Sequence, residues 1–223
     1  TDNDVFQITD NRLEVRAGVS LDFESQVDYS IRLQATDQGG LSIEEVAVVS
    51  LNDVNEPPQG IGFSRNNFVY ENVADQWIAN ITVLDPDEGE QHDFTVSDNR
   101  FEVVSGQLRL KANQSLNYEA EPTISLTVTS VDQGGFEATG EHVVEVWDLN
   151  DPPQVLNPIP DLNAIMNLRF RYVIPSDTFF DEDQSDWTSI SVSQPDGSPL
   201  PEWLSFDEAS HQFTGIPLAK DVG

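Results

Sequence analysis

The sequence predicts an all-β protein made of tandem Greek-key β-sandwich modules. Three observations predict this fold: strand-like alternation of apolar and polar residues, frequent turns rich in Gly, Asn and Asp, and an internal repeat. No segment shows a sustained helical period of 3.6 residues.

Four segments carry the strand signal most clearly. Residues 29–35 (YSIRLQA) and 124–130 (ISLTVTS) alternate apolar with polar side chains, as half-buried strands do. Residues 77–84 (WIANITVL) and 142–147 (HVVEVW) are rich in β-branched and aromatic residues. Each segment has the length of an ordinary strand, so antiparallel sheets are expected.

The internal repeat divides the chain into modules. Residues 6–59 align without a gap to residues 101–154, so that the DQGG sequence at Asp37 falls on the DQGG sequence at Asp132. Each repeat ends in a Pro-Pro pair, and proline stops strand pairing and stiffens a linker. The expected modules are 1–57, the C-terminal part of a module; 58–152, a complete module; and 153–223, the N-terminal part of a third module of a different type.

The composition points to bound cations. Ten Lys and Arg residues face 40 Asp and Glu residues, which gives a formal net charge of −30. Such a surface excludes nucleic-acid binding through a basic patch. No cysteine is present, so disulfides and thiolate metal sites are excluded, and no run of apolar residues is long enough to insert into a membrane. Carboxylates crowded in a fold repel each other unless a cation lies between them.

The acidic residues gather at module ends and in turns. In the second module the candidates are Glu71, Asp85, Asp87, Asn117, Glu119, Asp132 and residues 148–151. Oxygen donors from several turns, some carboxylate and some amide, form the ligand set of a hard cation and favour Ca²⁺ over Mg²⁺. The three histidines, His92, His142 and His211, lack metal-ligand spacing, so no zinc site is expected.

These motifs resemble the cadherin family, in which successive modules bind several calcium ions at their junction. At the first junction, the resemblance implies ligands from an Asp-x-Glu motif, a linker, an Asp-x-Asp motif and an Asp of a Gly-containing turn. The matching residues are Asp22, Glu24, Val54, Asn55, Glu56, Pro57, Asp85, Asp87 and Asp132. Glu56 stands where the family has Asp, and Pro57 replaces an Asn that contributes its carbonyl. Asp53 is expected to orient the linker.

The same motifs recur at the second junction. The matching residues are Glu71, Asn117, Glu119, Leu149, Asn150, Asp151, Pro152, Asp181 and Asp183. Asn117 replaces the Asp of the Asp-x-Glu motif. Because ligand charge helps set calcium affinity, this change weakens the outermost expected site.

The third unit resembles the dystroglycan-type cadherin-like domain, also a β-sandwich. Cadherin modules alternating with that type resemble large bacterial surface proteins, many of them adhesins. Trp77 and Trp147 are expected to pack in the core or at a junction, and Trp187 and Trp203 in the core of the third unit.

The resemblance implies a calcium-binding, extracellular segment of a cell-surface adhesion protein, secreted or outer-membrane-anchored, that is not an enzyme. Its expected partners are neighbouring modules of the same chain and either a homophilic protein partner or a polysaccharide. An alternative remains open: carbohydrate-binding modules attached to a polysaccharide-degrading or surface protein.

Overall fold

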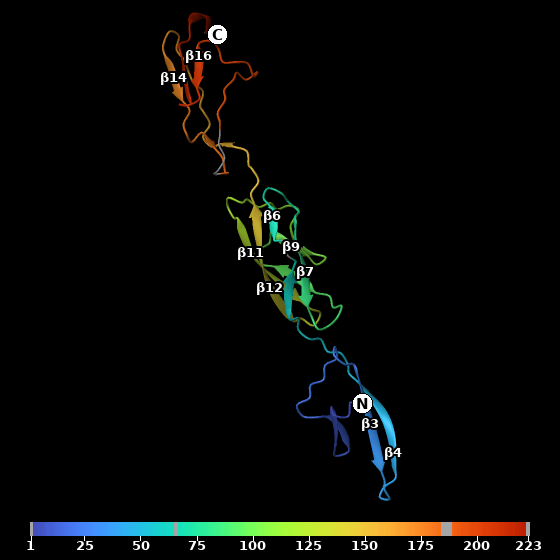
Figure 1. Cartoon of the computed structure of the whole chain (residues 1–223). Coiled ribbons are helices and arrows are strands. Elements are labelled where there is room, and N and C mark those ends of the chain that lie inside the picture. The colour runs from blue at the N-terminus through green and yellow to red at the C-terminus, as the bar shows by residue number, and fades with distance from the viewer. Residues whose placement is uncertain (1, 65–66, 184–188, 222–223) are drawn as a thin grey trace. The chain divides into compact units, whose positions relative to one another are not determined.

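The computed structural model describes residues 2–64, 67–183 and 189–221 (Figure 1). These residues form β-strands and one 3₁₀ helix at Ala219–Asp221, and none of them lies in an α-helix. The contacts divide the chain into two compact units, Thr1–Leu116 with Thr123–Val146, and Asn117–Pro122 with Trp147–Gly223. A helix with the length and apolarity needed to cross a membrane is not found within the described residues.

The second repeat, in the first unit, forms a β-sandwich. Its strands are β5 (Gly60–Phe63), β6 (Phe68–Tyr70), β7 (Trp77–Leu84), β8 (Asp93–Val96), β9 (Phe101–Val104), β10 (Gln107–Leu110), β11 (Thr123–Val131) and β12 (Glu137–Trp147). They make two four-stranded sheets, in the orders β5-β7-β10-β9 and β6-β12-β11-β8. Both sheets contribute to one core, in which Ile78, Leu108 and Val128 are fully buried. The predicted all-β sandwich is confirmed.

The first repeat follows the second strand by strand. Its strands are β1 (Phe6–Thr9), β2 (Arg12–Val15), β3 (Asp28–Thr36) and β4 (Ser42–Ser50). They begin 95 residues before β9, β10, β11 and β12 (for β1 and β9, 101 − 6 = 95), and they pair in the same register.

The turn between the paired long strands is also repeated. Asp37 accepts a hydrogen bond from the Leu41 amide, as Asp132 accepts one from the Phe136 amide. Gly40 has a φ of 83° and Gly135 a φ of 90°, a conformation that glycine adopts without strain. The repeated DQGG sequence therefore encodes one turn twice.

The first repeat leaves apolar residues exposed that the second repeat buries. In the second repeat, β7 pairs with β10 and β8 pairs with β11. Among the described residues, β2 pairs with β1 alone and β3 with β4 alone. As a result, Leu13 is 44% exposed, whereas its counterpart Leu108 is 0% exposed.

The second unit carries the remaining strands: β13 (Gln154–Val155), β14 (Phe170–Val173), β15 (Phe179–Phe180), β16 (Leu204–Asp207) and β17 (Gln212–Gly215). They form a β13-β15 pair and a three-stranded β14-β17-β16 sheet. Trp203 packs edge-on against Phe170, with ring centroids 6.2 Å apart, as its expected packing role requires. Trp187 lies outside the described residues.

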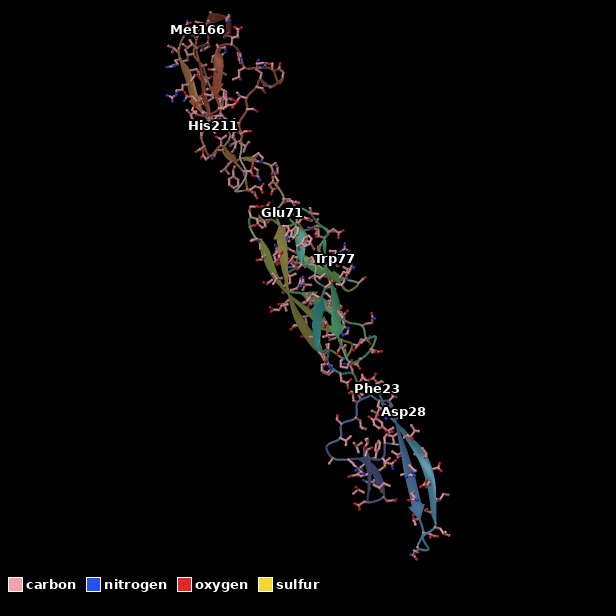
Figure 2. The ribbon with its side chains drawn as sticks, viewed as in Figure 1. Phe23, Asp28, Glu71, Trp77, Met166 and His211 are labelled. Atoms are coloured by element: carbon pink, nitrogen blue, oxygen red, sulfur yellow. The ribbon has the colours of Figure 1, made fainter. Side chains whose placement is uncertain are left out.

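Of the two positions expected for Trp77, the core is ruled out, and packing at a junction stays a prediction. Trp77 opens β7 and is 38% exposed (Figure 2). The register of β7 against β10 shifts between Leu108 and Arg109, and the two residues after Trp77, Ile78 and Ala79, are both buried. A bulge of this kind breaks the two-residue alternation and turns the tryptophan outward. Trp147, at the end of β12, is exposed to a similar extent.

Candidate metal-binding sites at the linkers

The first linker is hydrogen-bonded to the Asp-x-Asp motif that follows β7. The Asn55 side-chain amide donates to the Glu56 carbonyl over 3.1 Å, and the Glu56 amide donates to Asp87 Oδ2 over 2.9 Å. The Asp87 amide in turn donates to Asp85 Oδ1 over 3.1 Å. These three bonds fix the linker backbone and both carboxylates of the motif.

The second linker repeats all three bonds inside the second unit. The Asn150 side chain donates to the Asp151 carbonyl over 3.1 Å, and the Asp151 amide donates to Asp183 Oδ2 over 2.6 Å. The Asp183 amide donates to Asp181 Oδ1 over 3.2 Å. Asp183 is buried. The residues predicted to match at the two linkers thus have matching contacts.

Asp132 joins the first linker from the turn after β11. It is only 6% exposed, and its Oδ2 accepts a hydrogen bond from the Asn55 amide over 2.9 Å. Burial raises the pKa of Asp132, but the hydrogen bonds from Asn55 and from the amides of Phe136 and the turn glycines outweigh it, so the net pKa is lowered. A Cβ at Gly134 would lie 2.8 Å from the Asn55 side chain, which explains why a glycine stands there.

Four carboxylates of the first linker region lie close together. Glu24, Asp53, Glu56 and Asp87 each place one oxygen within 4.8 Å of the others. Glu56 Oε2 is buried and has no hydrogen-bond partner within the part of the chain that the structure describes. Asp53 thus lies inside the cluster, although it was expected only to orient the linker.

The charges in this cluster raise the pKa of two glutamates. Burial, and then the negative charges of Glu24, Asp87, Asp53 and Asp22, raise the pKa of Glu56. Hydrogen bonding to its own backbone lowers the pKa of Glu24, but burial and the charges of Asp53 and Asp22 more than offset this, so that pKa is raised as well. Both shifts mean that the ionised cluster lacks a counter-charge.

Asp22 lies beside the cluster but is held differently. Its oxygens accept hydrogen bonds from the Ser25 amide and hydroxyl, each over 3.0 Å, and these bonds lower its pKa. It therefore stays ionised and adds to the field that acts on Glu24 and Glu56.

A second carboxylate group lies in the second unit. Glu119, Asp151 and Glu182 each place an oxygen within 4.8 Å of the other two. Glu182 Oε2 accepts a hydrogen bond from the Asn117 side chain over 2.7 Å, and its Oε1 accepts one from Gln154 over 3.2 Å. Sequence reasoning missed Glu182, because the middle residue of the first Asp-x-Asp motif is Pro86.

The other predicted ligands are placed as follows. Glu71 follows β6 in the first unit and is completely buried (Figure 2). Val54, Pro57, Leu149 and Pro152 lie in the two linkers, where they have backbone carbonyls to offer.

The spacing of the histidines in the sequence predicted no metal site, yet His92 lies beside two acidic residues. Its Nε2 lies 2.9 Å from Asp85 Oδ2, and Glu90 completes a group whose three ligand atoms lie within 4.8 Å of one another. His92 lies seven positions after Asp85, so the loop between β7 and β8 must fold back to join them. That spacing matches no zinc motif and gave no signal in the sequence.

Comparison with known proteins shows what this chain is similar to. A family model described as a putative Ig domain matches residues 152–223. Protocadherin beta-1 of Homo sapiens is 32% identical over 160 residues, which cover 67% of this chain and 20% of that protein. Protocadherin Fat 1 of Homo sapiens is 30% identical over 165 residues, which cover 67% of this chain and 4% of that protein. The chain therefore spans one fifth or less of the length of these relatives.

Solved structures share the fold. The EC3-6 cis-dimer structure of protocadherin gammaB7 matches 97% of this chain and 56% of its own, with a TM-score of 0.64 and 22% identity. The human desmocollin-1 ectodomain matches 96% of this chain and 44% of its own, with a TM-score of 0.55 and 16% identity. In sequence and in fold, this chain is similar to the extracellular repeats of cadherins, and its last third matches a putative Ig domain.

Proposed function

We propose that this chain is a calcium-stiffened segment of a cell-surface adhesion protein, made of modules at residues 1–57, 58–152 and 153–223. Calcium ions bridge carboxylates of each linker and of the modules on either side. The bound ions hold each linker in one conformation, and the segment acts as an extracellular spacer or adhesive surface and not as an enzyme.

The observation that carries this proposal is the uncompensated charge at the first linker. Four carboxylates meet there, Glu56 Oε2 is buried without a partner among the described residues, and the pKa values of Glu56 and Glu24 are raised. A divalent cation would remove this repulsion and satisfy the buried oxygen. Oxygen ligands in flexible number favour calcium, and Mg²⁺, with its strict octahedral geometry, suits the set less well.

The two linkers would hold their ions with different ligand sets. At the first linker we assign the ions to Asp22, Glu24, the Val54 and Pro57 carbonyls, Asn55, Glu56, Asp85, Asp87 and Asp132. At the second we assign them to Glu71, Asn117, Glu119, the Leu149 and Pro152 carbonyls, Asn150, Asp151, Asp181 and Asp183. Asp53 and Glu182 are added because they lie in the two carboxylate groups.

Similarity to protocadherins and desmocollin supports the adhesive role, and the shared extracellular repeat type supports a location outside the cell. Beads coated with the chain test it directly. We expect them to aggregate in millimolar calcium and to disperse when a chelator is added. Dispersed beads in calcium, together with calcium-dependent binding on a glycan array, would instead support the carbohydrate-binding alternative.

Native mass spectrometry tests the metal itself. We expect several calcium ions per chain at millimolar calcium and a clear loss of them in Asp53→Asn/Asp87→Asn. At the same concentration of magnesium, fewer magnesium ions should be retained per chain. A spectrum without specifically bound calcium would overturn the proposal.

A further inference from the structure

We infer that Asp85, Glu90 and His92 form a second kind of cation site, suited to a first-row transition metal ion such as Zn²⁺. The three residues come from the end of β7 and from the loop that leads to β8. The site contains a nitrogen ligand, which distinguishes it from the oxygen-only sets proposed for calcium, although it shares Asp85 with the set of the first linker.

The group is built and mostly buried. The His92 side chain is 9% exposed and the Asp85 side chain 5%, with Nε2 and Oδ2 2.9 Å apart. The His92 ring also contacts the Phe94 ring, at a centroid distance of 6.4 Å. Asp85 keeps its other oxygen on the Asp87 amide. Each side chain is thus held in place by a contact outside the group, as supporting residues hold the ligands of metal sites.

Glu90 gives a separate reason to expect a cation in this group. Its Oε1 accepts a hydrogen bond from the Gln133 amide over 2.9 Å. Its Oε2 is buried, and no residue in the described ranges donates a hydrogen bond to it. A buried carboxylate oxygen without a donor is unfavourable, and a metal ion beside His92 and Asp85 would satisfy it.

The ligand chemistry selects the ion. Imidazole nitrogen with two carboxylates suits Zn²⁺ and its neighbours, whereas Ca²⁺ takes oxygen ligands. Zinc bonds of about 2.0–2.2 Å to nitrogen and oxygen would separate tetrahedral ligand atoms by roughly 3.3–3.5 Å. The present 2.9 Å contact would open by a few tenths of an ångström, which rotation of the His92 ring can provide. An open hollow lined by Glu90, His92 and Ser105, among others, borders the group and offers an ion a route of entry.

Zinc titration of the calcium-free chain tests this inference. We expect one zinc equivalent whose affinity falls at least about tenfold in His92→Gln and in Glu90→Gln, since even residues that only support metal ligands contribute about 10–100-fold. His211→Asn is the matched control. His211 lies in the other unit at a positive φ of 48°, which Asn tolerates, and it belongs to no such group among the described residues.

The wild-type chain provides a readout that needs no folded variant. It has three histidines, so ¹⁵N-histidine spectra are simple, and zinc should shift the ring signals of His92 ahead of those of His142 and His211. Unchanged His92 signals at saturating zinc, or equal zinc affinity in His92→Gln and His211→Asn, would overturn the inference. Because calcium is absent from these measurements, their failure would leave the calcium proposal standing.

Discussion

Replacing Asp87 with Asn separates the charge of the first linker cluster from its geometry. An Asn side chain keeps the size of Asp87, and its carbonyl oxygen can still accept the Glu56 amide. The change removes one of the four clustered carboxylates. Glu88→Gln is the matched control, because Glu88 is the next residue, is exposed, loses the same charge, and lies outside the cluster.

The expected magnitude follows from mass action. Calcium at tenfold excess over its dissociation constant stabilises the folded state by about 1.4 kcal/mol per ion. For a domain of about 60–100 residues this raises Tm by roughly 6–11 °C. If the loss of one ligand charge weakens binding about tenfold, the same calcium concentration yields only about 0.4 kcal/mol, a rise of roughly 2–3 °C.

Scanning calorimetry with calcium and with chelator measures both increments. We expect the wild type and Glu88→Gln to share the larger calcium-dependent rise in Tm and Asp87→Asn to show the smaller one. A full-sized rise in Asp87→Asn would refute the assignment of Asp87 as a ligand. A loss of the folded baseline in chelator would show instead that Asp87 is needed for folding.

Three further predictions concern pH, the second linker and the exposed apolar face. The raised pKa values of Glu56 and Glu24 penalise their ionised forms, so the calcium-free chain should gain stability as the pH falls from 7 toward their ordinary pKa of 4.5. The chain should lose stability below pH 3.8, where Asp22 and Asp132, whose pKa values are lowered, become protonated. Thermal unfolding in chelator at a series of pH values checks this, and a stability that falls steadily from pH 7 downward would contradict it. Asn117→Asp should lower Tm in chelator, because a carboxylate would then face Glu182, and it should enlarge the calcium-dependent rise in Tm. The double variant Asn117→Asp/Glu182→Gln should recover the Tm measured in chelator. An unchanged Tm in the single variant would count against the contact between residues 117 and 182. Leu108→Ala should cost about 2–5 kcal/mol in urea unfolding and Leu13→Ala about 1 kcal/mol or less, whereas equal costs would mean that the Leu13 side of the first repeat is covered in solution.

The sequence was sufficient for the architecture because its strand signals are local and its internal repeat has no gap. Alternation over residues 124–130, and the β-branched and aromatic residues of 77–84, mark strands without reference to the rest of the chain, and both strands form there. The gapless repeat then transfers strand positions from one module to the other, and four strands begin at the predicted offset. Trp77 escaped prediction because a bulge depends on pairing with β10, which alternation within β7 does not encode.

The candidate site was predictable where motifs recur and unpredictable where loops fold back. Asn55, Glu56, Asp85 and Asp87 were assigned from motifs that resemble those of cadherins, and the corresponding residues at the second linker have matching contacts. Glu182 approaches Asn117 from 65 residues away. Asn117 corresponds to Asp22, but Pro86 stands where Glu182 would have its counterpart, so no second copy of the pair marks it in the sequence. His92 reaches Asp85 through a loop whose path depends on tertiary packing.

The two linkers have the same contacts although their spacing differs by one residue. Asn55 precedes Asp85 by 30 positions (85 − 55), whereas Asn150 precedes Asp181 by 31 (181 − 150). What the linkers share is a strand pairing: Gly60 of β5 pairs with Leu84, directly before Asp85, and Gln154 of β13 pairs with Phe180, directly before Asp181.

This pairing brings the chain after each linker beside the end of the strand that carries the Asp-x-Asp motif. The linker amide then reaches the second Asp of the motif whatever the length of the intervening turn. Backbone pairing, and not a fixed sequence interval, therefore places these carboxylates. A cation would enter a site whose geometry these hydrogen bonds help to set, and by neutralising the clustered charge it would keep the linker in that conformation.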